Sequence, residues 1–114
     1  LNHTGMPIDL SPDGINLWKK GLKVLAKADN VAVKISALGM MNKNWTKDFI
    51  KPLVMETIEV FGSKRCMFAS NFPVDSLFSD YKTLWQSFDE ITKDFTKTER
   101  NQMFMENAER IYRI

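Results

Sequence analysis

The sequence predicts an α/β fold in which parallel strands alternate with helices. Two segments are typical of buried strands: the β-branched segment 31–36 and the apolar segment 65–70. The segments around them carry apolar residues spaced three and four apart, which indicates helices. Because strands that alternate with helices are joined by right-handed crossovers, we expect the strands to be parallel.

The first helix is predicted to begin after Ser11. Ser11 is a favourable N-cap, Pro12 fits the first helical position, and Asp13 complements the positive end of the helix dipole. An apolar stripe then continues to about residue 29. Upstream of this helix, we expect the segment 1–3 to be the end of another strand.

Three more helices are predicted after the strand at 31–36. The second runs from Lys47 or Pro52 to residue 61, before Gly62, which suits a C-terminal cap. The third covers about residues 77–94. The segment 96–99, Thr-Lys-Thr-Glu, matches a capping box and predicts a last helix to about residue 111.

Residues 1–114 are predicted to form a single partial domain. Three strands and four helices leave much apolar surface uncovered, and the chain begins in what looks like the end of a strand. We therefore expect the remaining strands to come from a longer polypeptide or a partner chain. On its own, the 114-residue chain is expected to be marginally stable.

The composition excludes several classes of function. A net charge of +2 with dispersed lysines argues against nucleic-acid binding, and no apolar stretch reaches the length of a membrane span. Cys66 is the only cysteine, which excludes an internal disulfide and favours a reducing, cytoplasmic compartment. We expect Cys66 to be a buried, inert thiol and the partner to be a small-molecule substrate.

Candidate catalytic residues follow the carboxyl ends of the predicted strands, where parallel α/β folds bind their ligands. His3, the only histidine, is expected to end the first strand. It is a candidate metal ligand, orienting group or general acid/base, with a structural histidine as the alternative. Asn71 is expected to be the last residue of an otherwise apolar strand face. Asp75 is an ionisable candidate nearby, although a helix N-cap is an alternative role for it.

Lys34 and Ser36 are candidate substrate-binding residues on one face of the middle strand. The opposite face carries Val31, Val33 and Ile35, which are too apolar to face water. We therefore expect Lys34 to point into the interior of the fold. A buried lysine requires an acidic partner or a polar cavity, so a structural ion pair and a substrate contact both remain open. Ser36, at the carboxyl end, is suited to hydrogen-bond a substrate.

Four motifs occur in a fixed order along the chain. They are His-x-Gly-x-Pro at 3–7, Asn-Val-x-x-Lys-Ile-Ser at 30–36, Phe-Gly followed by Arg-x-Met-Phe-Ala-Ser-Asn-Phe-Pro at 61–73, and Asn-Ala-x-Arg-x-Tyr at 107–112. Together they resemble the amidohydrolase-related (amidohydrolase-2 type) hydrolases, in particular the branch of 2-pyrone-4,6-dicarboxylate lactonase. The resemblance implies the carboxyl-terminal portion of a (β/α)8 TIM barrel, with about three parallel strands alternating with helices and a C-terminal helix.

The resemblance also implies an activity. Family members hydrolyse lactones or amides, so we expect the substrate to be a small carboxylated lactone or a similar cyclic ester or amide. A decarboxylase of the same superfamily is an alternative, and a non-catalytic remnant or interaction module is another for the isolated chain, which we expect to be inactive. The oligomeric state stays open.

Asn71 departs from the family pattern. The resemblance places a water-activating aspartate at this position, often as a metal ligand, but asparagine cannot take a proton from water. A divalent metal, zinc or manganese, is the family norm, and His3 is the only candidate ligand in this chain. The cofactor therefore stays open, and we expect weak or absent metal dependence. The general base would be Asp75 or an upstream residue.

Overall fold

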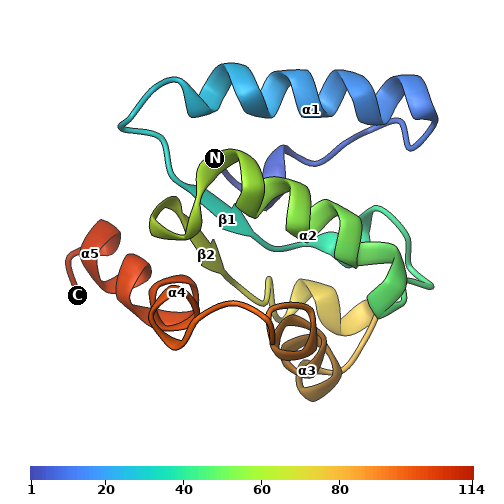
Figure 1. Ribbon diagram of the computed structural model, residues 1–114. Helices are drawn as coiled ribbons and strands as arrows, with labels where there is room; N and C mark the ends of the chain where they lie inside the picture. Colours follow the sequence, from blue (N-terminus) through green and yellow to red (C-terminus); the bar gives the residue numbers. More distant parts are fainter.

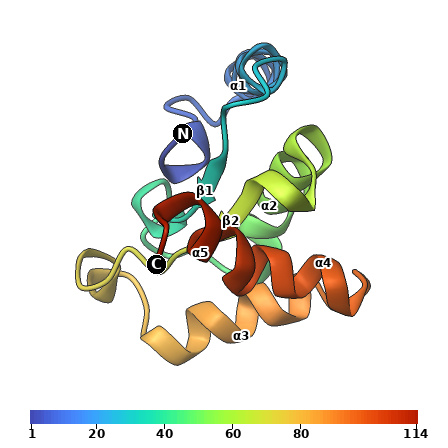
Figure 2. The same ribbon diagram turned by 90° about the vertical axis from the view of Figure 1, so that its left-hand side faces the viewer.

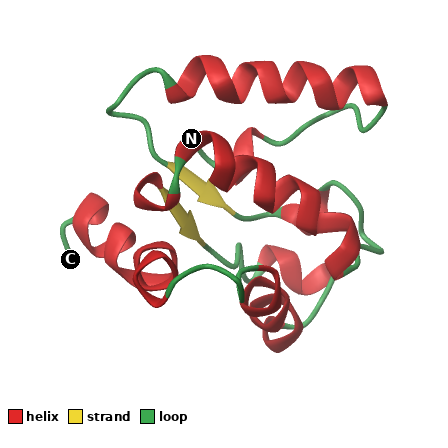
Figure 3. Cartoon of the chain, in the orientation of Figure 1, coloured by secondary structure: helices red, strands yellow, loops and turns green.

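The computed structural model describes residues 1–114, and its main helices pack against one face of a small parallel sheet (Figures 1 and 3). Strand β1 (Val33–Ile35) pairs with β2 (Cys66–Phe68), with Val33 opposite Cys66 and Ile35 opposite Phe68. The predicted parallel pairing is thus confirmed. Both strands are shorter than predicted, although the backbone ladder continues for one bond beyond them, from the amide of Ala69 to the carbonyl of Ile35 at 3.0 Å.

The backbone of Leu1 lies on the other side of β1. Its amino group donates to the carbonyl of Ala32 at 2.7 Å, and its carbonyl accepts from the amide of Lys34 at 2.9 Å. These two bonds follow the pattern of a parallel neighbour, so Leu1 extends the sheet on the side away from β2.

The prediction that this first strand continues to His3 is wrong. His3–Gly5 form a single 3-10 turn, in which φ is 53° at His3 and 55° at Thr4. Both values fall in the left-handed region, which cannot continue a strand. The indole Nε1 of Trp18 donates to the carbonyl of Thr4 at 2.8 Å and anchors the turn to the first helix.

The first two helices begin where the sequence predicts. Helix α1 covers Pro12–Ala26 and α2 covers Lys47–Phe61, and the side chains of Ser11 and Thr46 cap them. Helix α1 ends before the predicted residue 29. Pro52 lies inside α2 and does not start it. The two helices pack against each other on one side of the sheet (Figure 1).

The carboxyl-terminal helices differ more from the prediction. Helix α3 (Tyr81–Ile91) begins later than residue 77, because Asp80 caps it by accepting from the amide of Thr83 at 2.8 Å. Residues Val74–Leu77 form a separate 3-10 turn. The capping box between Thr96 and Glu99 is confirmed.

The last predicted helix is divided into three parts. It consists of α4 (Lys97–Asn101), a π-helical turn (Gln102–Glu106) and α5 (Asn107–Tyr112). All the helices are too short or too polar to cross a membrane.

One core lies between the sheet and the helices. Its sixteen buried residues are Trp18, Leu22, Val33, Ile35, Leu38, Ile50, Leu53, Val54, Ile58, Phe61, Cys66, Phe68, Leu84, Phe88, Ile91 and Met103. The first and third residues of each strand belong to this core. The middle residues, Lys34 and Met67, are paired in register and do not belong to it. The alternation predicted for the middle strand is therefore confirmed, and Lys34 faces away from the helix-covered core.

Candidate functional site

The segments that follow the two strands lie side by side, on the same side of the molecule (Figure 2). An added Cβ at Gly39 would lie 2.9 Å from the Cβ of Phe78, so only glycine fits this approach without a shift. The amide Nδ2 of Asn71 lies 3.7 Å from the sulfur of Met40. We call the segments 3–5, 36–40 and 69–75 the carboxyl rim.

His3 and Ser36 meet at the carboxyl rim. Nδ1 of His3 and Oγ of Ser36 are hydrogen-bonded across 2.8 Å, although the residues are 33 positions apart in the chain. Ser36 directly follows β1 and is only 1% exposed, while His3 is half-buried. The structure thus brings together two predicted site residues and places Ser36 behind the imidazole. The direct substrate contact expected of Ser36 stays a prediction.

Asn71 and Asp75 form a second pair at the same rim. Nδ2 of Asn71 donates to Oδ1 of Asp75 across 2.9 Å. The expectation that Asn71 ends a strand face is wrong, since β2 ends at Phe68 and Asn71 has a φ of 57°. Asparagine tolerates this left-handed conformation better than most residues, because its short polar side chain can bond locally.

Asp75 is buried, with 3% of its surface exposed. The N-cap role considered for it is wrong, because Asp80 caps α3 and the side chain of Asp75 caps no helix. Its only side-chain hydrogen bond is the one from Asn71. A buried carboxylate with a single neutral partner is costly unless it serves a further interaction, which makes Asp75 a functional candidate.

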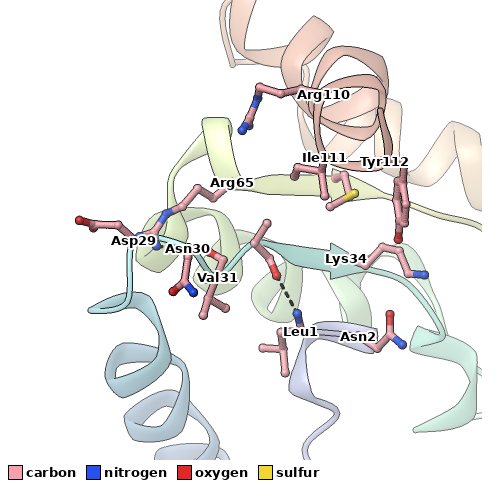
Figure 4. A pocket seen from close by; sticks show the side chains of 12 residues that line it. Leu1, Asn2, Asp29, Asn30, Val31, Lys34, Arg65, Arg110, Ile111 and Tyr112 are labelled. Atoms are coloured by element: carbon pink, nitrogen blue, oxygen red, sulfur yellow. Dashed lines mark hydrogen bonds between the residues drawn. The ribbon is translucent and has the colours of Figure 1, made fainter. Parts of the chain in front are cut away.

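Lys34 lies apart from these two pairs. It lines a cavity of about 430 Å³ together with Met67, the residue opposite it in β2 (Figure 4). The lining also includes Asp29 and Arg65, which precede the strands, so the cavity extends toward the amino ends of the strands. None of the four salt bridges includes Lys34. The ion pair considered for this lysine is therefore not formed within the 114 residues.

A metal site requires several ligating side chains in one place. No group of three or more His, Cys, Asp or Glu side chains in this chain is arranged to hold an ion. The rim offers one imidazole with Nδ1 bonded to Ser36, one carboxylate bonded to Asn71, and a neutral amide. Zinc is usually held by three or four nitrogen, sulfur or carboxylate ligands, so these residues alone do not fit a metal.

Cys66 belongs to the core rather than to the rim. It is fully buried, and burial raises the pKa of its thiol from 9.0 to about 12. The thiolate, which is the reactive form, is therefore disfavoured, as expected for a structural cysteine.

Sequence reasoning missed two residues of the rim and the role of two motif residues. Gly39 and Met40 lie in the loop after β1, where Gly39 contacts Phe78 and Met40 contacts Asn71, and the only signal for them was a glycine shortly after a strand. Arg65 and Asn107 belong to the quoted motifs but serve as anchors. Asn107, for example, donates from Nδ2 to the carbonyls of Ser63 and Cys66 at 2.6 and 2.7 Å.

Comparison with known proteins identifies relatives of this chain. The amidohydrolase family model matches residues 1–114. The uncharacterized protein y4mH of Sinorhizobium fredii is 53% identical over 114 residues, which make up 100% of this chain and 38% of that protein. The chain thus spans well under half the length of this relative.

Solved structures share the fold. Two crystal structures of an amidohydrolase from Burkholderia multivorans, one with bound HEPES and one with bound zinc, match with a TM-score of 0.93 at 23% identity. These matches cover 100% of this chain and 44% and 43% of the two structures. Amidohydrolase 2 from Bifidobacterium longum subsp. infantis matches with a TM-score of 0.66 at 26% identity, over 99% of this chain and 38% of that one.

These matches confirm the predicted fold class, an α/β arrangement that fits the carboxyl-terminal portion of a (β/α)8 barrel. Together with the family model that covers all 114 residues, they lead to one conclusion: this chain belongs to the amidohydrolase family.

Proposed function

We propose that this chain supplies part of the active site of a hydrolase that opens a small carboxylated lactone, or a similar cyclic ester or amide. The observation that carries the proposal is the presence of two hydrogen-bonded polar pairs, His3–Ser36 and Asn71–Asp75, at the carboxyl ends of parallel strands. Barrel enzymes have their active sites at this end of the sheet. Membership of the amidohydrolase family supports hydrolytic chemistry.

Asn71 is suited to orient the attacking water. Asp75 holds its Nδ2, so the amide group has a fixed orientation and its Oδ1 is free to accept a hydrogen bond from water. In the proposed reaction, the water oxygen bonds to the carbonyl carbon and the bond from that carbon to the ring oxygen breaks. Asn71 cannot take the proton that the water releases, so the proton passes to Asp75 or to a base outside these residues, and from that base to the departing ring oxygen, which leaves as a hydroxyl group.

His3 and Lys34 are suited to act on the substrate. The imidazole of His3 is half-buried at the rim, where it can donate to the carbonyl oxygen and stabilise the negative charge that develops there. Lys34 lies two residues before Ser36 on the same face of the strand and has no acidic partner, so we propose that its ammonium group reaches the carboxylate of a substrate bound at the rim.

A bound metal is not part of this proposal. The Burkholderia multivorans structure with zinc supports metal binding within this fold. The residues of this chain do not fit a metal by themselves, and Asn71 lacks the charge that a carboxylate would offer. We therefore propose that metal dependence is weak or absent.

The proposal is tested by assaying the complete protein against small lactones with and without a carboxylate. Lys34→Met is compared with Lys82→Met, a matched change at an exposed position on α3. We expect Lys34→Met to raise KM for carboxylated lactones about tenfold, equivalent to about 1.4 kcal/mol, and Lys82→Met to have no effect. Absence of hydrolysis of all lactones, cyclic esters and amides would overturn the proposal. Equal KM values for the two variants would overturn the role of Lys34.

A further inference from the structure

We propose that Ser36 is a positioning residue that holds His3 in the tautomer with its hydrogen on Nε2. His3 then presents a hydrogen-bond donor at the carboxyl rim. The tautomer itself follows from the geometry of the two side chains, whereas its use on a carbonyl oxygen rests on the proposed function.

The direction of the hydrogen bond follows from the surroundings of Ser36. Its Oγ lies 2.8 Å from Nδ1 of His3, the residue is 1% exposed, and the hydroxyl makes no other hydrogen bond within the chain. If Nδ1 were the donor, the hydroxyl hydrogen of Ser36 would be buried without an acceptor, at a cost of about 1–3 kcal/mol. Donation from Ser36 to Nδ1 avoids this cost. In a neutral imidazole, the hydrogen then resides on Nε2.

The backbone around His3 is a second, independent observation. His3 and Thr4 both have left-handed φ values, of 53° and 55°, although neither is glycine. Such conformations cost about 1–3 kcal/mol each and persist only where the surroundings hold them. Here Thr4 is fully buried and its carbonyl accepts from Nε1 of Trp18 at 2.8 Å. Trp18 thus fixes the backbone of the turn, and Ser36 fixes the ring.

The position of Ser36 is itself set by the sheet. It directly follows Ile35, the last residue of β1, which lies opposite Phe68 and belongs to the buried core. The next residue, Ala37, has a φ of 58° and turns the chain away from the sheet. The hydroxyl of Ser36 therefore stands on a rigid element, which is the requirement for a residue that orients another.

The tautomer has a chemical consequence. An imidazole with its hydrogen on Nε2 can donate to a substrate carbonyl and stabilise the oxyanion that forms when water adds. The same nitrogen has no lone pair with which to take a proton from water or to bind a metal. His3 would then act as a donor, and the base would be a different residue.

The experiment observes the imidazole of His3 in the complete protein, where its signals are assigned by their loss in His3→Asn; His3 is the only histidine of residues 1–114. Long-range ¹H–¹⁵N NMR of the ¹⁵N-labelled protein, recorded at alkaline pH where an imidazole is neutral, reports both ring nitrogens of each histidine. We expect an unprotonated Nδ1 and a protonated Nε2. A protonated Nδ1 of His3 in the unmodified protein would overturn the proposal.

Two variants test the role of the serine. Ser36→Ala removes the hydroxyl and is expected to give shifts averaged over both tautomers. Ser87→Ala is the matched control, because Ser87 is also buried but donates to the carbonyl of Thr83 in α3 at 2.8 Å. A Ser36→Ala spectrum identical to that of the unmodified protein would overturn the proposal.

Activity provides a separate measurement. With a lactone that the complete protein hydrolyses, Ser36→Ala is expected to lower kcat about tenfold with little change in KM, as for other residues that orient a catalytic group. An unchanged kcat would show that the orientation of His3 does not matter for the reaction. If no lactone is hydrolysed, the proposed function fails, and the NMR result still decides the tautomer.

Discussion

Asn71 and Asp75 are joined through their side chains at the carboxyl rim, with Nδ2 of Asn71 donating to Oδ1 of Asp75 across 2.9 Å. The pair combines a neutral amide with a buried carboxylate, so it carries one negative charge. A second carboxylate at position 71 would place two like charges at hydrogen-bond distance, which is unfavourable unless a proton or a cation lies between them. The identity of residue 71 therefore decides whether this pair attracts a metal.

Asn71→Asp is expected to increase the affinity for Zn²⁺ or Mn²⁺ at least about tenfold, or about 1.4 kcal/mol, because a cation relieves the repulsion between the two carboxylates. Isothermal titration calorimetry measures this change. Asn16→Asp, at an exposed position on α1, adds the same charge away from the rim and is expected to have no effect. Stoichiometric zinc in the unmodified protein, or equal affinity in both variants, would contradict this account of the pair.

Arg65 is expected to be important for stability. Its guanidinium donates four hydrogen bonds, to the carbonyls of Ala26, Ala28, Val31 and Phe61 at 2.9–3.3 Å, and so connects the ends of α1 and α2 to the sheet. Hydrogen bonds that involve a charged group are stronger than neutral ones, so Arg65→Ala is expected to lower the free energy of unfolding by about 2–4 kcal/mol.

Arg65→Lys separates geometry from charge. A lysine keeps the charge but lacks the planar array of donors, so it is expected to restore less than half of the loss. Urea unfolding of both variants measures the effect, with Arg113→Lys at the exposed end of the chain as the matched control. Full stability of Arg65→Lys would show that the charge alone is sufficient.

Asn107 is expected to hold the last helix against the start of β2. Its Nδ2 donates to the carbonyls of Ser63 and Cys66, and the residue is only 2% exposed. Asn107→Ala leaves two carbonyls without their donor and is expected to cost about 2–3 kcal/mol in the free energy of unfolding. Asn107→Asp, which has no donor when ionised, is expected to cost more at neutral pH than at acidic pH, where a protonated carboxyl can donate one bond. Equal stability of Asn107→Asp at both pH values would contradict this assignment.

The buried thiol of Cys66 is expected to make the free energy of unfolding depend on pH in the alkaline range. Burial raises the pKa of the folded-state thiol from 9.0 to about 12, so the folded state keeps its proton while the unfolded chain releases it. The contribution of the protonated thiol to the free energy of unfolding is fully present below pH 9.0. It falls as the pH rises toward 12, by at most about 1.4 kcal/mol per pH unit. Cys66→Ala lacks this titration, so the difference in unfolding free energy between the two proteins should change across this window. A constant difference would contradict the assignment.

The sequence predicted most of the element order, because its signals are local. Ser11, Thr96 and the β-branched residues around Val33 determine caps and a strand through short-range chemistry, and the structure confirms them. The direction of Lys34, away from the helix-covered core, followed from strand alternation. The end of the first strand could not be predicted in this way. His3 and Thr4 are held in left-handed conformations by Trp18, which lies fourteen residues after Thr4, and no local pattern shows this.

The candidate site was predictable as a set of residues but not as a set of contacts. Ser36 was expected to contact substrate, and Asp75 to be either a base or a helix cap. In the structure, Ser36 is hydrogen-bonded to His3 and Asp75 to Asn71, and the sequence predicted neither contact. Such pairings depend on the register of β1 and β2 and on the paths of the loops after them, which sequence patterns do not encode.

The central claim is that the carboxyl rim hydrolyses a lactone through His3. The most direct measurement is the rate of lactone opening by the complete protein and its His3→Asn variant, since asparagine tolerates the left-handed φ of 53° at this position. We predict that the unmodified protein opens a carboxylated lactone and that His3→Asn, with unchanged unfolding free energy, lowers kcat by about 100-fold or more. Hydrolysis by the variant at the rate of the unmodified protein would contradict the claim.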